Sequence, residues 1–249
     1  MPKRTEITAI IPTYNGAKYV AEAIQSINRQ TYPVEEIIVV DDGSDDETET
    51  IVMNQEGNIR FIKQPHKGDP AFGRNTGIRE AKTGLIAFLD QDDLWPENKL
   101  EIQTKNLMRF PEAMVDVGIT HVFNQKGEKF EHDFGRFKEF EQYFLLSSGL
   151  FRKSVFDTIG LFDEKIKFHA SDYDWIFRAV ENKVMFNLHK EITLLYRHHE
   201  ENYSNSFVKL RLGLMEVVKR SLVRRRNKDN GSIMPLPPMN TTTNKLNDE

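Results

Sequence analysis

The stretch Leu85–Trp95, with the sequence LIAFLDQDDLW, decides how the rest of the chain is interpreted. Its first half is a short apolar run with the length and composition of a buried strand. Its second half places three carboxylates within the four residues Asp90–Asp93. Carboxylates this close repel one another unless they are solvated or a divalent cation lies among them. Taken alone, the pattern is typical of a solvated acidic turn before a helix at Pro96, with Asp93 as a cap for that helix.

The residues before this stretch alternate between strand and helix patterns. Continuous apolar runs predict buried strands, whereas apolar residues at helical spacing predict helices with one buried face. The predicted strands are 7–11, 36–40, 59–62 and 85–90, and the predicted helices are 17–30, one from about Asp45 with Ser44 and Glu47 as a capping box, 73–81, and one from Pro96 to about Phe110. This alternation predicts an α/β fold with a doubly wound, mostly parallel sheet flanked by helices.

The second half of the chain has a different pattern. We expect strands over 115–119, 121–123, 184–188 and 192–196, helices over 155–159, 172–182 and 207–226, a turn over 124–129, and no clear period over 130–141. In the last helix, Leu210, Leu214, Val217 and Leu222 are predicted to share one side. The predicted division is 1–110, 111–206, a basic amphipathic helix over 207–228, and a disordered Asn/Thr/Pro-rich tail over 229–249.

Composition excludes some functional classes. The net charge of −4 over 249 residues gives no general affinity for nucleic acid. The chain has no cysteine, so it has no disulfide and no thiolate metal site. The N-terminus shows no signal-peptide pattern, and no apolar run approaches the roughly 18 residues of a membrane span. From these features we expect a cytoplasmic protein.

One segment departs from the mild overall charge. Residues 207–228 contain eight Lys or Arg and one Glu, a local charge of +7, so the remainder carries −4 − 7 = −11. Two interpretations of 207–226 stay open. The helix is either solvated and packed on the domain, or it makes peripheral contact with anionic lipid at the inner face of the membrane.

Three predicted strands end in polar turns, and parallel strands bring such turns to one edge of a sheet. The turns are Pro12–Asn15, Asp41–Ser44 and Asp90–Asp93, and Arg74 at the start of a helix reaches the same edge. Acids alone repel a phosphate, but acids together with a divalent cation and an arginine bind one. The composition suits a nucleoside diphosphate held through a metal, with Asp41 or Asp42 accepting hydrogen bonds from a base or ribose.

Four motifs together resemble those of the family-2 glycosyltransferases of the GT-A fold. They are Ile10–Asn15, Val39–Ser44, Gly73–Gly77 and Phe88–Asp93, and the resemblance covers about residues 5 to 205. It implies a GT-A fold with a nucleotide-sugar-binding half over 1–110 and a smaller, acceptor-side half over 111–206. It also implies inverting, metal-dependent transfer of a sugar, most simply from a UDP-sugar, to a glycan, lipid-linked or other hydroxyl acceptor.

Site residues carry over by matching position. The resemblance implies that the donor contacts Pro12, Thr13, Tyr14, Asn15, Asp41, Asp42, Arg74, Asp90 and Gln91, with Thr13 and Tyr14 at the base and Asp90 at the ribose or the water shell of the metal. It implies that Asp92 binds Mn²⁺ or Mg²⁺. The family often has Tyr-Arg-x-His before a Ser, and Tyr196–His199 matches this pattern with Ser204 following, so His199 is expected to support the metal.

The expected general base is Asp172. Ser171–Arg178 resembles the family pattern Glu-Asp-x-Asp followed by apolar residues and Arg, with Ser171 in place of the Glu. Read from the residues alone, Asp172 is better explained as a helix-start acid stabilised by the helix dipole. Asp174 is either a supporting acid or another helix-start charge, and the two tryptophans are expected to be packing groups.

Two functions from other classes remain as alternatives. The first is a non-catalytic nucleotide-sugar-binding protein on the same scaffold. The second is a nucleotidyltransferase, which is disfavoured because Pro12–Lys18 contains one glycine where a phosphate loop needs several. The sequence does not identify the sugar or the acceptor.

Overall fold

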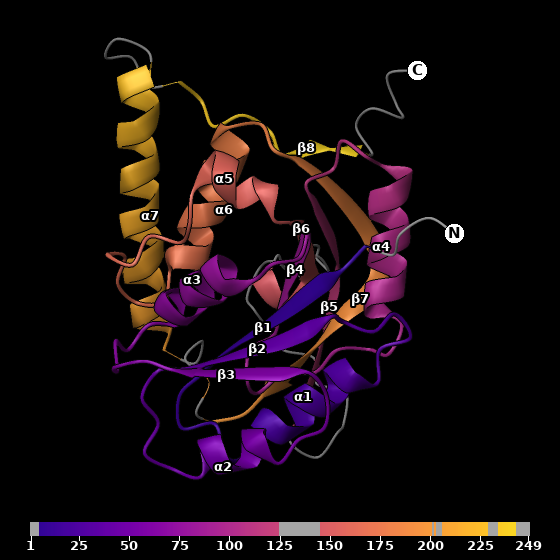
Figure 1. The fold of residues 1–249 in the computed structure, drawn as a ribbon. Helices are drawn as coiled ribbons and strands as arrows, with labels where there is room; N and C mark the ends of the chain where they lie inside the picture. The colour runs from indigo at the N-terminus through magenta and orange to yellow at the C-terminus, as the bar shows by residue number, and fades with distance from the viewer. Residues whose placement is uncertain (1–4, 125–144, 201, 203–205, 229–233, 243–249) are drawn as a thin grey trace.

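One sheet forms the centre of the molecule. The computed structural model describes residues 5–124, 145–200, 202, 206–228 and 234–242. Within them eight strands lie in the order β3-β2-β1-β4-β6-β5-β7-β8 (Figure 1). They are β1 (Ile7–Thr13), β2 (Glu36–Asp41), β3 (Ile59–Lys63), β4 (Leu85–Phe88), β5 (Val115–Asn124), β6 (Gly149–Arg152), β7 (Met185–His198) and β8 (Asn240–Thr241). All neighbours are parallel except β6, which runs antiparallel to β4 and β5. The predicted doubly wound, mostly parallel α/β sheet is confirmed.

Helices cover both faces of this sheet. One apolar layer joins the sheet to α1 (Val20–Asn28), α2 (Thr48–Met53) and α4 (Lys99–Arg109). The other joins it to α3 (Pro70–Glu80), α5 (Ser154–Ile159) and α6 (Ser171–Glu181). Strand β2 shows why its sequence is continuously apolar, because Ile37 and Val39 enter the first layer while Ile38 and Val40 enter the second. The last helix, α7 (Phe207–Lys228), packs against α6 at the side of the molecule (Figure 1).

The predicted capping box at Ser44 is wrong. Helix α2 begins at Thr48, with Glu47 as its N-cap. The Ser44 hydroxyl instead donates to the Asp41 carboxylate and accepts the backbone N–H of Asn15 at 2.8 Å. Ser44 therefore links the turns after β1 and β2 and is not available to cap a helix.

The predicted helix start at Pro96 is also wrong. Helix α4 begins at Lys99 with Asn98 as its N-cap. Gln30, beyond the end of α1, donates to the Pro96 carbonyl at 2.7 Å and accepts the Leu100 N–H at 3.0 Å. A side chain 70 residues earlier in the chain thus caps this helix, and nothing in the local sequence reveals it. A third helix, α3, begins three residues before the predicted Gly73, because Asp69 caps it by accepting the Ala71 N–H at 2.9 Å.

The C-terminal predictions hold only in part. The tail beyond Asn227 was expected to be disordered, but Asn240 and Thr241 pair with β7 as β8. In α7, Val217 and Leu222 were predicted to share one buried side. Val217 is buried, but Leu222 is exposed, so the prediction is wrong at Leu222. Apart from Asn124, which ends β5, the turn over 124–129 and the aperiodic stretch over 130–141 lie outside the described residues.

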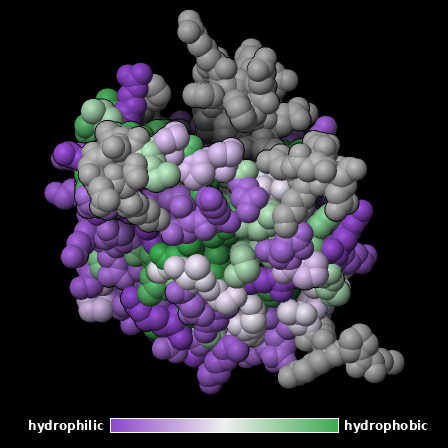
Figure 2. All heavy atoms as spheres, turned by 90° about the horizontal axis from the view of Figure 1, so that it is seen from above, coloured by the Kyte–Doolittle hydropathy of each residue, from purple (hydrophilic) through white to green (hydrophobic). Residues whose placement is uncertain are grey.

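The surface is largely hydrophilic, as expected for a chain in which 29% of the residues are charged. Seen from above the view of Figure 1, the molecule is covered mainly by hydrophilic residues, with hydrophobic ones emerging mostly near the middle of the face (Figure 2). No helix in the described ranges has both the length and the apolar composition that crossing a bilayer requires.

Candidate functional site

A cavity of about 620 Å³ lies at the carboxyl ends of β1, β2 and β4, where the sequence predicts a ligand site. The predicted site residues that line it are Pro12, Thr13, Tyr14, Asp42, Arg74, Asp90, Gln91, Asp92 and Asp172. The predicted residues Asn15, Asp41 and His199 are not part of its wall. The structure therefore gathers acids, an arginine and an aromatic ring from both halves of the chain around one space.

Gln91 fastens the turn after β1 to the turn after β4. Its side-chain oxygen accepts the Thr13 hydroxyl at 2.6 Å and the Tyr14 N–H at 2.9 Å, and its amide donates to the Tyr14 carbonyl at 3.2 Å. A Cβ on Gly16 would lie 2.5 Å from the Thr13 hydroxyl oxygen, so only glycine fits beside this arrangement. The Tyr14 ring stays 43% exposed against His66, with ring centroids 4.2 Å apart. This open aromatic edge is suited to stacking on a planar base.

Asp41 and Asp42 have different environments although they are adjacent. Asp41 is fully buried, and its carboxylate accepts the hydroxyl and the N–H of Ser44. Asp42 reaches the cavity, where its carboxylate accepts the N–H groups of Lys67 (3.0 Å) and Gly68 (2.8 Å). Asp42 thereby holds the loop after β3 against the cavity, whereas Asp41 belongs to the turn beneath it.

Arg74 crosses the cavity from α3 to the β4 turn. Its Nη2 donates to Asp90 Oδ1 at 2.7 Å, and its Nε is buried without a hydrogen-bond acceptor in the described part of the chain. Burial acts to lower the pKa of Arg74, but the charges of Asp90 and Asp172 outweigh burial and leave that pKa above its ordinary value. Arg74 is therefore a fixed cation with an unused donor.

Asp92 is the cavity residue best suited to hold a metal. Its Oδ2 lies 3.0 Å from His199 Nε2 and 3.4 Å from the amide nitrogen of Asn202. Mg²⁺ and Mn²⁺ typically take one or two protein carboxylates and complete their shell with water and substrate phosphates, and imidazole is a further suitable ligand. Within the described residues no cluster of three or more His, Asp or Glu side chains has metal-site geometry. Asp92 and His199 are therefore the residues that could hold such an ion.

Asp93 does not cap the helix that follows it. It is 1% exposed, and its carboxylate accepts the Arg197 N–H at 2.9 Å, which joins the β4 turn to β7. Burial, together with the charges of Asp92 and Asp90, raises the pKa of Asp93 well above its ordinary value. Of the three acids in the opening stretch, Asp93 is thus the one that ties the β4 turn to β7.

Asp172 lies in the first turn of α6 and faces the same cavity. Burial raises the pKa of Asp172 to about 6, and the charge of Arg74 limits this rise, as does the N–H of Tyr173, which donates to Asp172 Oδ1 at 2.7 Å. The charge of Asp90 adds to the rise. A carboxylate with a pKa this close to neutrality can accept a proton from a bound hydroxyl.

Several wall residues were missed by the sequence analysis. The loop before α6 places Phe168 and His169 in the left-handed region, with φ of 63° and 50°, and His169 Nε2 lies 3.2 Å from the Gly68 carbonyl. His66, Tyr173 and Asn202 also line the site. No sequence signal marks His66 and His169, because their positions depend on loop geometry. Asn202 lies three residues after His199, so the Tyr196–His199 motif could have indicated it. Strained backbone of this kind is common beside active sites.

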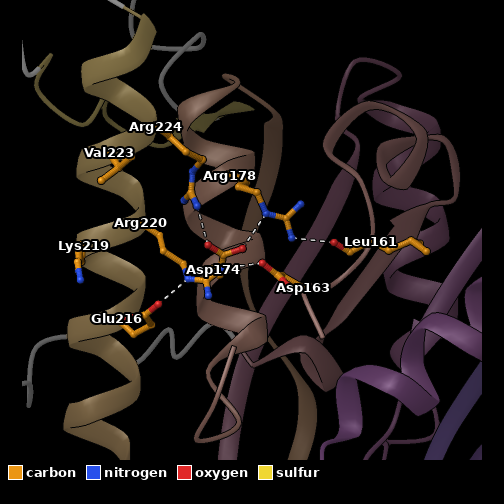
Figure 3. A pocket seen from close by; sticks show the side chains of 9 residues that line it. All are labelled: Leu161, Asp163, Asp174, Arg178, Glu216, Lys219, Arg220, Val223 and Arg224. Atoms are coloured by element: carbon orange, nitrogen blue, oxygen red, sulfur yellow. Dashed lines mark hydrogen bonds and ion pairs between the residues drawn. The ribbon is translucent and has the colours of Figure 1, made fainter. Parts of the chain in front are cut away.

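Asp174 and the two tryptophans serve packing. Asp174 is 1% exposed, and its two oxygens accept from Arg178 Nε and Arg224 Nη1, each at 2.8 Å (Figure 3). These bonds lie beside a hollow of about 510 Å³ between α6 and α7. Trp95 and Trp175 are buried, as expected for packing groups. Asp174 therefore joins α7 to the helix that carries Asp172.

Comparison with known proteins adds a family match. Residues 8–165 match the family described as Glycosyl transferase family 2. An uncharacterized glycosyltransferase of Rickettsia typhi is 32% identical over 213 residues, which covers 80% of this chain and 66% of the relative. The UDP-Glc:alpha-D-GlcNAc-diphosphoundecaprenol beta-1,3-glucosyltransferase WfgD of Escherichia coli is 35% identical over 104 residues, 41% of each chain. The chain thus spans at most about two thirds of the length of these relatives.

Solved glycosyltransferase structures share the fold. TarS 1-349 of Staphylococcus aureus in complex with UDP-GlcNAc superposes with a TM-score of 0.71 at 22% identity, covering 89% of this chain and 67% of that one. The mannosyltransferase PcManGT of Pyrobaculum calidifontis, in complex with GDP-Man and Mn²⁺, superposes with a TM-score of 0.70 at 18% identity, covering 90% and 65%. The predicted GT-A architecture is confirmed by these likenesses.

Proposed function

The chain belongs to glycosyl transferase family 2, and from that premise we propose that it transfers a sugar with inversion from a UDP-sugar to an acceptor hydroxyl, with a divalent metal. In this proposal residues 1–110 bind the nucleotide sugar and residues 111–206 supply the acceptor side and the base. The observation that carries the proposal is Asp172, a carboxylate with its pKa raised to about 6 in the same cavity as the Arg74–Asp90 pair.

The proposed reaction is a single displacement. The acceptor oxygen forms a bond to the anomeric carbon while the bond from that carbon to the diphosphate oxygen breaks, so the configuration inverts. Asp172 takes the proton of the acceptor hydroxyl, which makes the oxygen a better nucleophile as the new bond forms. The nucleoside diphosphate leaves with the bonding electron pair.

Residues on the donor side position the leaving group. Tyr14, open and backed by His66, offers a surface for the base. Arg74 offers its buried Nε to a diphosphate oxygen, and charge-assisted bonds of this kind strengthen as negative charge develops. A donor oxygen would satisfy this buried Nε, which has no acceptor in the described structure.

Asp92 and His199 are the residues that would hold the divalent ion, with Asn202 beside them. Such an ion supplies positive charge that stabilises the leaving diphosphate. The family membership and the Mn²⁺ in the PcManGT complex support this part of the proposal. We expect Asp92→Asn to weaken Mn²⁺ binding by about tenfold or more in the presence of UDP, measured by calorimetry. Unchanged affinity would place the ion elsewhere.

The direct test compares two Asp→Asn variants on neighbouring elements. Asp172→Asn keeps the size of the side chain but cannot take a proton, so we expect transfer to fall by about 10² to 10⁴-fold, while UDP affinity changes little. Asp157→Asn, at an exposed position on α5, should leave both properties unchanged. A donor panel of UDP- and GDP-sugars with Mn²⁺ gives the readout, scored by transfer and by slow donor hydrolysis. Near wild-type transfer by Asp172→Asn would remove the base assignment, and donor binding without any turnover would favour the non-catalytic alternative.

A further inference from the structure

The outward side of α7 is apolar along most of its length. Its large exposed apolar residues are Val208 (69%), Leu212 (45%), Met215 (69%), Val218 (43%), Leu222 (37%) and Val223 (51%). The spacing of 208, 212, 215 and 222 places these positions on one face of a helix. The opposite face is the packed one, because Val217 is fully buried against Ile166 and Ala170. The exposed stripe is thus separate from the side that holds α7 on the domain.

Positive charge accompanies this stripe. The outward positions at the same helical spacing include Arg211, Lys219 and Arg226, all exposed. The single acid of α7, Glu216, bonds to Arg220 at 2.7 Å. Figure 3 shows Glu216, Arg220 and Arg224 turned toward α6, with Lys219 on the side away from it. The outward face therefore combines large apolar side chains with cations, and the single acid of α7 is already bonded to Arg220.

We propose that this face, defined by Val208, Leu212, Met215, Lys219 and Leu222, docks on an anionic lipid surface. Such a surface offers acyl chains to the apolar residues and negatively charged headgroups to the cations, which is the pairing that interfacial helices use. A second copy of this chain would bring cations against cations. A nucleic acid would leave the apolar residues without partners. Charge complementarity thus selects the lipid surface.

Docking by α7 would also set the position of the cavity. Helix α7 packs on α6, which carries Asp172, and Leu210 of α7 lines the cavity itself. An enzyme held by the outward face of α7 would keep the cavity within reach of a lipid-linked acceptor at the same surface. This consequence for the acceptor rests on the proposed function, whereas the docking does not.

Vesicle co-sedimentation tests the docking with the full chain and no substrate. We expect binding to phosphatidylcholine vesicles that contain phosphatidylglycerol, little binding to phosphatidylcholine alone, and weaker binding as salt rises. Met215→Gln should weaken binding about tenfold, whereas its matched control Met53→Gln, at a methionine that is 66% exposed on α2, should not. Lys219→Glu changes the charge by two units, so it should weaken binding roughly 25-fold, since each charge near an anionic surface contributes about fivefold. Lys82→Glu, at another exposed lysine, is its control.

A fluorescence measurement checks the same face by a second route. Because the chain has no cysteine, Met215→Cys and Met53→Cys each give a single site for an environment-sensitive dye. A blue shift on anionic vesicles at position 215 but not at 53 supports the proposal. No binding to anionic vesicles, binding that is unchanged in Met215→Gln and Lys219→Glu, or concentration-dependent self-association that these two variants abolish would each overturn it.

Discussion

Asp172 and Asp174 lie two residues apart at the start of α6, yet their surroundings are opposite. Asp174 is 1% exposed and accepts hydrogen bonds from two arginines, Arg178 and Arg224. Asp172 faces the cavity, where burial raises its pKa to about 6 and the nearby cation, Arg74, acts through its charge. A carboxylate bonded between two cations thus joins helices, whereas a desolvated carboxylate that faces a cavity stays available to take a proton.

The largest effect is expected from removing the structural member of the pair. Asp174→Ala leaves two guanidinium groups facing each other without their buried carboxylate. We expect the free energy of unfolding to fall by about 3 kcal/mol, measured by urea denaturation. Asp157→Ala, at an exposed position, should change stability by less than about 0.5 kcal/mol. If the two variants lose the same amount, Asp174 does not hold α6 to α7.

Replacing Asp172 is expected to increase the free energy of unfolding, the opposite of the effect at Asp174. The pKa of Asp172 is raised from 3.8 to about 6 in the folded protein, so the folded state holds the proton more tightly than the unfolded state. Its contribution to stability therefore falls as pH rises from about 4 to 6, and the full penalty is present above 6. Asp172→Asn should then stabilise the protein by up to about 3 kcal/mol near pH 8 and by almost nothing near pH 3.5. A loss of stability near pH 8, read from urea titrations at both pH values, would contradict this environment.

A smaller effect distinguishes the arginines of the two acids. The charge of Arg74 lowers the pKa of Asp172. In the pH profile of kcat/KM, Arg74→Gln should therefore move the midpoint of the acid limb to a pH about one unit higher. Arg224→Gln removes the same charge beside Asp174 and should leave the limb in place. The midpoint of the acid limb does not depend on the maximal kcat/KM, which the loss of Arg74 also lowers. An equal shift in both variants would mean that the overall charge of the protein, rather than the charge of Arg74 in the cavity, determines the midpoint of the acid limb.

The smallest effect concerns Asp90. Its negative charge raises the pKa of Asp172, and it also bonds to Arg74. In Asp90→Asn both changes act in one direction, since the repulsion disappears and Arg74 loses a competing partner. We expect the acid limb to move downward by about half a pH unit, measured in the same assay. An upward shift would show that Asp90 mainly holds Arg74 near Asp172.

Much of the sheet could be predicted because burial on both faces makes each parallel strand a continuous apolar run, as in β2. The edge that gathers Asp42 and Asp92 followed from the strand ends, and Arg74 was placed there by the helix predicted to begin beside it. Helix starts were less readable, because Gln30 and Ser44 satisfy groups that lie elsewhere in the chain.

The roles of the individual acids at the site were harder to predict than the edge of the sheet at which they lie. Asp41 and Asp42 are adjacent identical residues, and only the turn geometry decides that Asp42 faces the cavity. Asp172 and Asp174 posed the same problem, since the partner Arg224 comes from a helix 50 residues later. Long-range partners of this kind leave no local pattern. The sequence therefore predicted which residues gather at this edge of the sheet but not which of them face the cavity.

The most direct test of Asp172 as the base is the pH dependence of kcat/KM for the wild-type protein, because it reports the pKa of the base in the free enzyme. We expect the logarithm of kcat/KM to rise with unit slope at low pH and to level off above a midpoint near pH 6, the pKa of Asp172. A profile that stays flat down to about pH 4, the range of an ordinary aspartate, would contradict the assignment of Asp172 as the base.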